Sequence, residues 1–233
     1  FGGGSPMDVA KLAAYLLGSG DSIADIYGVD LAKGTRLPLV LVPTTAGTGS
    51  EATGISIVTV GGAEKKGVVA PALVADVAIL DAGLTLGLPR HVTAATGIDA
   101  MVHAIEAYTS ARLKNPLSDA LAREALRLLS AHLVRACDEP TDTAARQAML
   151  LGAHLAGVAF ANAPVGGVHA LAYPLGGHFH VPHGHSNALM LAPVLAHNLA
   201  GAAGDYAEQQ RLLINNPVPI VEADARLLYE AAF

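Results

Sequence analysis

Residues 94–105 read Ala-Ala-Thr-Gly-Ile-Asp-Ala-Met-Val-His-Ala-Ile, an apolar run that contains one acid and one imidazole. Asp99 and His103 are four residues apart, so a helix over this stretch places them on one face. An unpaired carboxylate buried in such a helix costs several kcal/mol, and Asp99 therefore needs a partner. A divalent metal ion would satisfy both side chains at once. The alternative is that Asp99 caps a helix that starts after a break at Thr96 and Gly97.

Residues 169–185 hold a cluster of imidazoles in a segment rich in glycine and proline: His169, His178, His180, His183 and His185. A carboxylate with several imidazoles is a ligand set for a divalent transition metal. A single histidine in a helix is more often structural, but five in this span beside Asp99 and His103 favour a metal site. The zinc-protease motif His-Glu-x-x-His is absent from the sequence. These two segments therefore predict metal-assisted chemistry.

The composition limits the classes of protein that fit the chain. Its 233 residues are 52% hydrophobic and 15% charged, which is enough to bury one large core or two small ones. The sequence contains no run of about eighteen apolar residues, which argues against a membrane span. The formal charge of −6 and the scattered lysines and arginines argue against nucleic acid as a partner. The single cysteine, Cys137, fits a structural thiol in a reducing compartment such as the cytoplasm.

The hydrophobic pattern changes near residue 90. Before it, β-branched runs predict strands at 38–43, 54–60 and 76–80, the first and last buried on both faces. After it, a helical period dominates and predicts helices near 91–110, 116–136, 141–160, 164–173, 186–200 and 221–232. The simplest architecture is an α/β part followed by an all-helical part.

Two loops of small residues accompany the α/β part. Residues 2–8, GGGSPMD, predict a helix with Ser5 as its N-cap, Pro6 as its first residue and Gly18 at its end. Its start would suit a phosphate, although a tight turn capped by serine explains the pattern too. Residues 44–51, TTAGTGSE, follow a predicted strand, where α/β proteins bind ligands. Neither loop has the spacing of a standard dinucleotide or P-loop motif.

Five stretches together resemble one family, the iron-containing (group III) alcohol dehydrogenases. They are GGGSPMDVAK (2–11), PTTAGTGSEAT (43–53), the run from KKG to DVAILDAGLT (65–85), AATGIDAMVHAIEAY (94–108) and VHALAYPLGGHFHVPHGHSNAL (168–189). They occur in the family's order and cover nearly all of residues 2–208. The resemblance implies a dehydroquinate synthase-like two-domain fold. Residues 1–89 would form part of an α/β NAD(P)-binding domain, and residues 90–233 an α-helical metal-binding domain.

The resemblance also implies an activity and the residues that support it. The activity is reversible hydride transfer between an alcohol and NAD or NADP, with Fe²⁺ as a Lewis acid on the substrate oxygen; Zn²⁺ would accept the same ligands. The implied metal ligands are Asp99, His103, His169 and His183. The implied cofactor contacts are Gly3, Gly4, Ser5, Thr44, Thr45, Thr48, Thr53, Lys66 and Leu84. Some members carry a proton-relaying histidine where this chain has Tyr173, so Tyr173, His178 or His180 is expected to take that role.

The chain also departs from the family's pattern. The α/β stretch that opens family members, with its acidic residue that selects NAD over NADP, is absent before Phe1. A further segment is absent near 209–211, so we expect a part of a longer protein. We expect a cytoplasmic homodimer that acts on a small alcohol or aldehyde, with no nucleic acid or membrane partner. The alternatives are a dehydroquinate synthase-type or glycerol dehydrogenase-type enzyme, a maleylacetate reductase, or a metal- and nucleotide-binding module without turnover.

Overall fold

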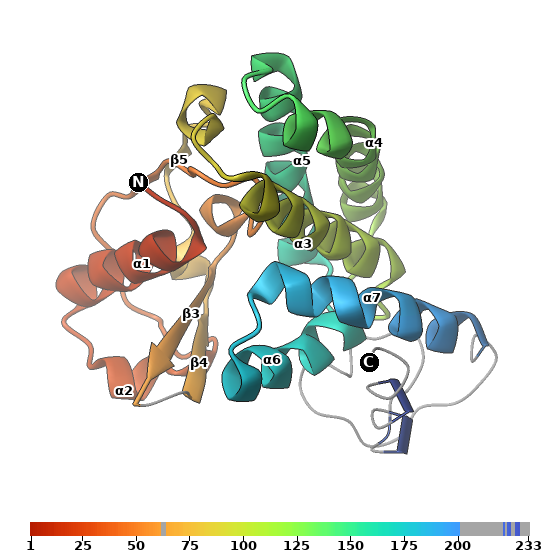
Figure 1. The fold of residues 1–233 in the computed structure, drawn as a ribbon. Coiled ribbons are helices and arrows are strands. Elements are labelled where there is room, and N and C mark those ends of the chain that lie inside the picture. Colours follow the sequence, from red (N-terminus) through yellow and green to blue (C-terminus); the bar gives the residue numbers. More distant parts are fainter. Residues whose placement is uncertain (62–63, 201–220, 222, 225–226, 229–233) are drawn as a thin grey trace.

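A computed structural model gives the fold, and it describes residues 1–61, 64–200, 221, 223–224 and 227–228. An α/β part comes first in the chain and a helical part second, and the two lie side by side (Figure 1). The predicted change of architecture near residue 90 is therefore what the structure shows.

The α/β part consists of one long helix and two small sheets. Its elements are α1 (Gly4–Ser19), α2 (Ile23–Ile26), β1 (Gly28–Val29), β2 (Val40–Leu41), η1 (Ser50–Ala52), β3 (Ile55–Val60), β4 (Glu64–Val69), η2 (Pro71–Leu73), β5 (Val77–Ala78) and η3 (Ala82–Thr85). One sheet has the order β1-β4-β3, with β1 parallel and β3 antiparallel to β4. The other is the parallel pair β2-β5. Helix α1 packs its apolar side, including Met7, Leu12 and Tyr15, toward both sheets.

The ends of α1 differ from the prediction. Gly3 is the N-cap and Ser5 lies inside the helix, so the prediction of a serine cap is wrong. The helix ends at Gly20, whose φ of 76° suits glycine, rather than at Gly18. Gly18 is small for another reason. A Cβ there would come within 2.7 Å of the backbone of Arg36 and Leu37, which crosses the helix at this point.

The predicted strands are present but two of them are short. The prediction at 54–60 matches β3, whereas those at 38–43 and 76–80 shrink to β2 and β5. Val40 and Val77 are 51% and 48% exposed, so the prediction that these strands are buried on both faces is wrong. The reason is that they pair only with each other among the described strands, and only Leu41 of β2 and Leu39 just before it are buried against α1. Strand β4 was not predicted, because two neighbouring lysines, Lys65 and Lys66, after the predicted strand at 54–60 are typical of a solvated turn.

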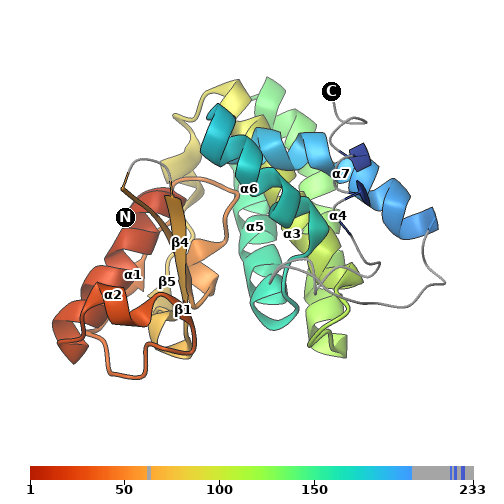
Figure 2. The same cartoon turned by 90° about the horizontal axis from the view of Figure 1, so that it is seen from below.

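The helical part has a core of small side chains. Its elements are α3 (Arg90–Thr109), α4 (Pro116–Asp138), α5 (Thr143–Asn162), α6 (Gly167–Phe179) and α7 (His183–Ala200). Alanines on α3, α4 and α5 meet in one buried cluster, which lets these helices approach closely. Helices α6 and α7 pack on the other side of α3 through Val102, Leu171 and Met190. Figure 2 shows α6 beside β4, so the α/β part faces α6.

The predicted boundaries of α6 and α7 are wrong, and so is the alternative that Asp99 caps a helix. Helix α6 runs through Pro174 and ends at Phe179, and its C-cap His180 takes a left-handed conformation with φ of 56°. Pro174 is exposed and removes one N–H donor from α6 without ending the helix. Helix α7 begins at His183, earlier than the predicted start near 186. Helix α3 passes through Thr96 and Gly97 without a break, so Asp99 is not a cap.

Two further expectations concern the C-terminal region and membranes. The segment expected to be missing near 209–211 and most of the predicted helix at 221–232 fall outside the described residues. Among the residues that are described, no single helix has the length and apolar character needed to cross a membrane. Of these residues, only α5 and α6 taken together have that length and apolar character, and the two helices are bent by 108° at the break between them.

Candidate metal centre and cofactor cleft

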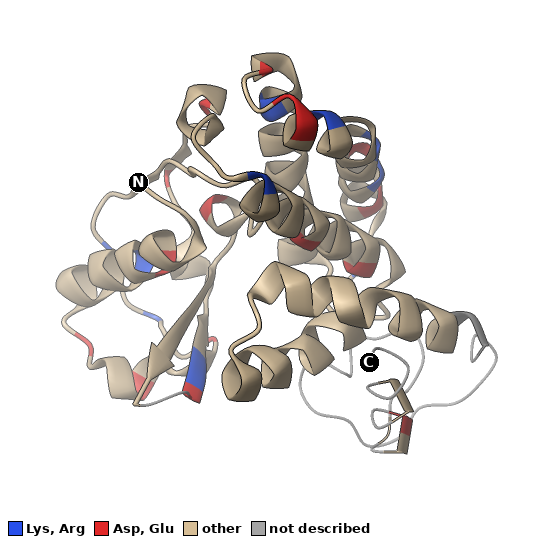
Figure 3. Ribbon diagram, in the orientation of Figure 1, with Lys and Arg blue, Asp and Glu red and all other residues tan. Residues whose placement is uncertain are grey.

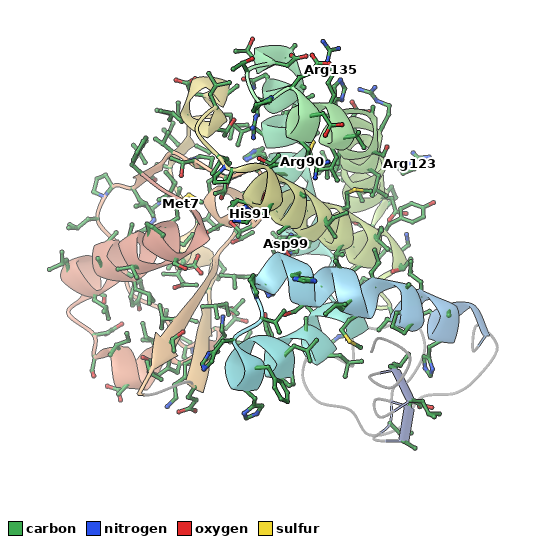
Figure 4. The ribbon with its side chains drawn as sticks, in the orientation of Figure 1. Met7, Arg90, His91, Asp99, Arg123 and Arg135 are labelled. Atoms are coloured by element: carbon green, nitrogen blue, oxygen red, sulfur yellow. The ribbon has the colours of Figure 1, made fainter. Side chains whose placement is uncertain are left out.

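Three side chains that are distant in sequence converge on one point, where Asp99 and His169 are buried and His183 is partly exposed. Asp99 comes from α3, His169 from α6 and His183 from α7. The Asp99 Oδ1 atom lies 3.7 Å from His169 Nε2 and 3.6 Å from His183 Nε2. Each residue offers one ligand atom, and the three atoms lie within 4.8 Å of one another. Figure 4 shows Asp99 where α3 passes the start of α7.

These separations fit a divalent ion. An ion bound at about 2.0–2.2 Å from an imidazole nitrogen and a carboxylate oxygen bridges atoms up to about 4 Å apart, and both carboxylate–imidazole distances are shorter than that. The donors are one oxygen and two nitrogens, with no thiolate, a set that suits Fe²⁺ and also Zn²⁺. The residues present therefore fit the metal that the sequence predicts.

His103 lies beside this group. It is buried, one helical turn after Asp99, and its ring stacks between Phe160 and His169 with centroid distances of 4.4 and 4.5 Å. Its Nδ1 atom has no hydrogen-bond partner among the described residues. An unpaired buried nitrogen is costly unless something binds it. The three mutually close ligand atoms belong to the other residues, so the role of His103 as a fourth ligand stays a prediction.

Asp99, His103 and His183 have the protonation states that metal binding needs, whereas His169 has to lose a proton before it can bind a metal. Burial lowers the pKa of His103 to about 3 and also lowers that of His183, which leaves both rings neutral with a free lone pair at neutral pH. Burial alone would raise the pKa of Asp99, but the surrounding imidazoles outweigh it and hold that pKa below its usual range. Burial would lower the pKa of His169, but hydrogen bonds to Asp99 and Glu106 raise it to about 9.

Only α3 supplies acids to this site from the helical part. Figure 3 shows that α6 and α7 carry no charged side chains, and residues 162–200 indeed contain no Asp, Glu, Lys or Arg. Glu106, two turns after Asp99, is buried with its Oε2 atom 2.5 Å from His169 Nδ1. Asn187 is fully buried and donates from Nδ2 to Asp99 Oδ1 at 2.6 Å. Neither residue was predicted; the spacing of Glu106 from Asp99 and His103 on one helix face was the available signal.

The two small-residue loops lie next to each other. Gly2 donates to Val42 O at 3.1 Å, and Thr44 donates back to Gly2 O at 2.9 Å, in the pattern of a parallel bridge. A Cβ on Gly4 would come within 2.7 Å of the Thr48 methyl group, so the glycine allows the loops to touch. The first residues of α1 therefore lie beside the hydroxyl groups of the second loop. The helix start and these hydroxyls form a surface suited to phosphate and ribose groups.

A cavity of about 240 Å³ joins these loops to the ligand cluster. It receives residues from both parts of the chain: Gly4, Ser5, Asp8, Thr48, Ser50, Thr53, Ile55, Ile57, Lys65, Val69, Asp99, His103, Phe160, Val165, His169, Tyr173 and His183. A second cavity of about 340 Å³ lies between the β3–β4 hairpin and the α6–α7 corner. Lys65, Tyr173 and His183 line both. The cluster is thus reached from a cleft between the two parts.

The two halves of the chain match models of one family. Residues 1–82 match the iron-containing alcohol dehydrogenase model, and residues 93–232 match the model of the C-terminal part of the Fe-containing alcohol dehydrogenase family. The chain belongs to the iron-containing alcohol dehydrogenase family. The predicted family, its two-part fold and its class, an iron-dependent alcohol dehydrogenase, are thereby confirmed.

Individual members agree with this placement. The long-chain-alcohol dehydrogenase 1 of Geobacillus thermodenitrificans is 40% identical, over 100% of this chain and 73% of its own length. The chain spans about half the length of several other curated relatives. An iron-containing alcohol dehydrogenase of Thermotoga maritima superposes with a TM-score of 0.86 at 31% identity, over 99% of this chain and 73% of that one. A sulfoacetaldehyde reductase of Bifidobacterium kashiwanohense, solved with NAD⁺, has a TM-score of 0.87 at 29% identity, over 100% and 75%.

Most of the cofactor residues implied for this alcohol dehydrogenase lie at or next to the smaller cavity, and two do not. Gly4, Ser5, Thr48 and Thr53 line the smaller cavity, while Gly3, Thr44 and Thr45 lie in the touching loops next to it. Leu84 lies in η3 and does not line either cavity. Lys66 does not line them either. Its ammonium group lies 5.3 Å from the centre of the Tyr27 ring and 3.5 Å from Glu64.

Lys65, its neighbour, is the lysine at the cleft. Side chains alternate along β4, and Val68, on the same face as Lys66, is buried in the core under α1. Lys65 and Val69 lie on the other face and line the cavity with Ile57 of β3. The alternation of side chains between the two faces of a strand could have shown which of the two lysines faces the cleft. It could be applied only once this segment was known to be a strand.

The three residues expected to relay a proton lie at different places. Tyr173 lines both cavities, and its ring stacks on that of His183 with centroids 5.9 Å apart. His180 is exposed at the C-terminal end of α6 and lines only the larger cavity. His178 is exposed and lines neither. The geometry therefore favours Tyr173 among the three.

Proposed function

We propose that this chain forms the metal and cofactor site of an enzyme that interconverts an alcohol and an aldehyde with NAD or NADP. The observation that carries the proposal is the cluster of Asp99, His169 and His183, which lies in the cleft lined by both small-residue loops. A metal centre and a phosphate-binding loop in one cleft are what metal-assisted hydride transfer requires. The NAD⁺ complex of the similar sulfoacetaldehyde reductase supports the choice of cofactor.

The proposed roles follow the two parts of the chain. Residues 1–89 hold the cofactor: Gly3, Gly4 and Ser5 at the start of α1 bind the pyrophosphate, and the hydroxyls of Thr48 and Thr53 bind the remainder. Residues 90–233 hold the metal through Asp99, His103, His169 and His183. An Fe²⁺ ion bound there supplies a Lewis acid that lowers the pKa of the alcohol oxygen.

The remaining residues of the cleft orient the substrate and move its proton. Phe160 and Val165 form an apolar wall beside His103 and His169, which suits the alkyl chain of a primary alcohol and keeps water away. Tyr173, stacked on His183, is placed to pass the hydroxyl proton toward the larger cavity. The finer predictions, Zn²⁺ in place of Fe²⁺, NADP, a cytoplasmic location and a homodimer, stay predictions.

The proposal is tested by metal analysis and by turnover. Protein purified without oxygen is analysed for iron and zinc, and reduced nicotinamide is followed by its near-ultraviolet absorbance with NAD⁺ or NADP⁺ and a panel of primary alcohols. Bound iron with alcohol-dependent reduction is the expected result. Metal and nucleotide binding without turnover on any alcohol would instead identify a binding module and reject the proposed activity.

The two neighbouring lysines provide a matched pair for the cofactor site. We expect Lys65→Ala to raise the KM for the cofactor roughly tenfold, about 1.4 kcal/mol, because Lys65 lines the cleft. Lys66→Ala should leave that KM unchanged, since Lys66 lies over Tyr27 on the opposite face of β4. Steady-state kinetics with varied cofactor measure both variants. The reverse pattern would show that Lys66, as implied by the family resemblance, is the contact.

A further inference from the structure

Glu106 makes two hydrogen bonds on the side of His169 that faces away from the ligand cluster. It is 5% exposed and lies on the face of α3 that carries Asp99 and His103. Its Oε2 atom lies 2.5 Å from His169 Nδ1, and its Oε1 atom accepts from the backbone N–H of Val168 at 2.7 Å. The carboxylate thus forms hydrogen bonds with both the His169 ring and the backbone at the start of α6.

We propose that Glu106 is a positioning residue that fixes the tautomer and the orientation of His169 for metal binding. The inference rests on the proposed metal site. An ionised carboxylate only accepts hydrogen bonds, so the one proton that the His169 ring keeps in its metal-binding form is held on Nδ1, beside Glu106. The lone pair is then on Nε2, the atom that faces Asp99 Oδ1 at 3.7 Å. Carboxylates placed behind metal-binding histidines act in this way in many sites.

The alternative is that Glu106 only caps α6. Helix α6 has no side-chain cap of its own at Gly166, and Val168 is one of its first residues. One carboxylate oxygen is sufficient for that bond, however, and the second oxygen contacts the imidazole. The segment 162–200 contains no acid, so a carboxylate behind His169 has to come from another element. The two roles make different predictions for metal affinity.

The test compares two buried glutamates that contact histidines. Glu106→Gln removes the charge behind His169, and Glu51→Gln makes the same change where Glu51 Oε1 lies 3.1 Å from His154 Nδ1, outside the ligand cluster. Zn²⁺ affinity is measured by chelator competition, and the ligand field by the visible spectrum of the Co²⁺-loaded protein. We expect Glu106→Gln to weaken Zn²⁺ binding about 10- to 100-fold and to shift the Co²⁺ bands. Glu51→Gln should change neither.

The outcomes separate this inference from the proposed function. If the wild-type chain binds no Zn²⁺ or Co²⁺, the metal site itself is rejected, and the role of Glu106 with it. If the wild type binds and Glu106→Gln binds equally well with an unchanged spectrum, Glu106 is a helix cap and the inference is wrong. Nitrogen-15 NMR of histidine-labelled, Zn²⁺-loaded wild type gives a check that needs no variant. A proton on Nδ1 of His169 supports the inference, and a proton on Nε2 overturns it.

Discussion

Asp99→Ala is expected to remove metal binding and turnover together. Asp99 supplies the sole carboxylate among the three mutually close ligand atoms, and it lies within 3.7 Å of both imidazole nitrogens. Without it, the imidazoles of His169 and His183 and the stacked ring of His103 offer the ion no negative charge. Removing a residue that only supports a ligand weakens metal binding about 10- to 100-fold, so loss of the ligand itself should exceed about 100-fold. Metal content after dialysis and the initial rate of alcohol oxidation measure the two effects.

A surface carboxylate provides the control for this variant. Asp138 ends α4, pairs with Arg90 at 3.0 Å and is distant from the cluster, so Asp138→Ala should retain the bound metal. Asp99→Ala should also keep its far-ultraviolet circular dichroism, because Asp99 makes no bond that closes the helix. Full metal content and full activity in Asp99→Ala would remove this residue from the ligand set.

The sequence predicts the parts of the site that lie within one helix, and tertiary packing determines the rest. The spacing of Asp99 and His103 is sufficient to place them on one face, and α3 bears this out. No local pattern distinguishes His183 from His178, because the choice depends on how the start of α7 meets α3. The contact between Gly2 and Val42 likewise joins segments that are forty residues apart.

The errors in the elements have similar causes. Pro174 and the two glycines after it predict the end of a helix, but α6 continues through them to Phe179, with Leu171 and Leu175 packed in the core on either side of the proline. The lysine pair predicts a turn, and its pairing with β3 turns it into a strand. That pairing also decides which lysine reaches the cleft. A family resemblance transfers residues by position and is therefore sensitive to a shift of one residue along a strand.

Gly184→Ala is expected to damage the metal site without changing a ligand. Gly184 follows His183 at the start of α7, where a Cβ would overlap the carbonyl group of Ala95 on α3. Since backbone atoms cannot move aside as a flexible side chain does, α7 has to shift away from α3. Overpacking of this kind costs about 1–3 kcal/mol. The shift moves His183 away from Asp99, so we expect metal affinity to fall at least tenfold in chelator competition, together with a lower thermal midpoint.

Gly87→Ala is the matched control, since a Cβ at this exposed loop glycine meets nothing within 4 Å. It should leave metal affinity and the thermal midpoint unchanged. A normal metal affinity in Gly184→Ala would mean that α7 is not held against α3 at this point, and that His183 reaches the cluster by another arrangement. The expected result would instead explain why the segment His183-Gly184-His185 carries a glycine. At this position the absence of a side chain sets the distance between the two helices, and that distance brings His183 to Asp99.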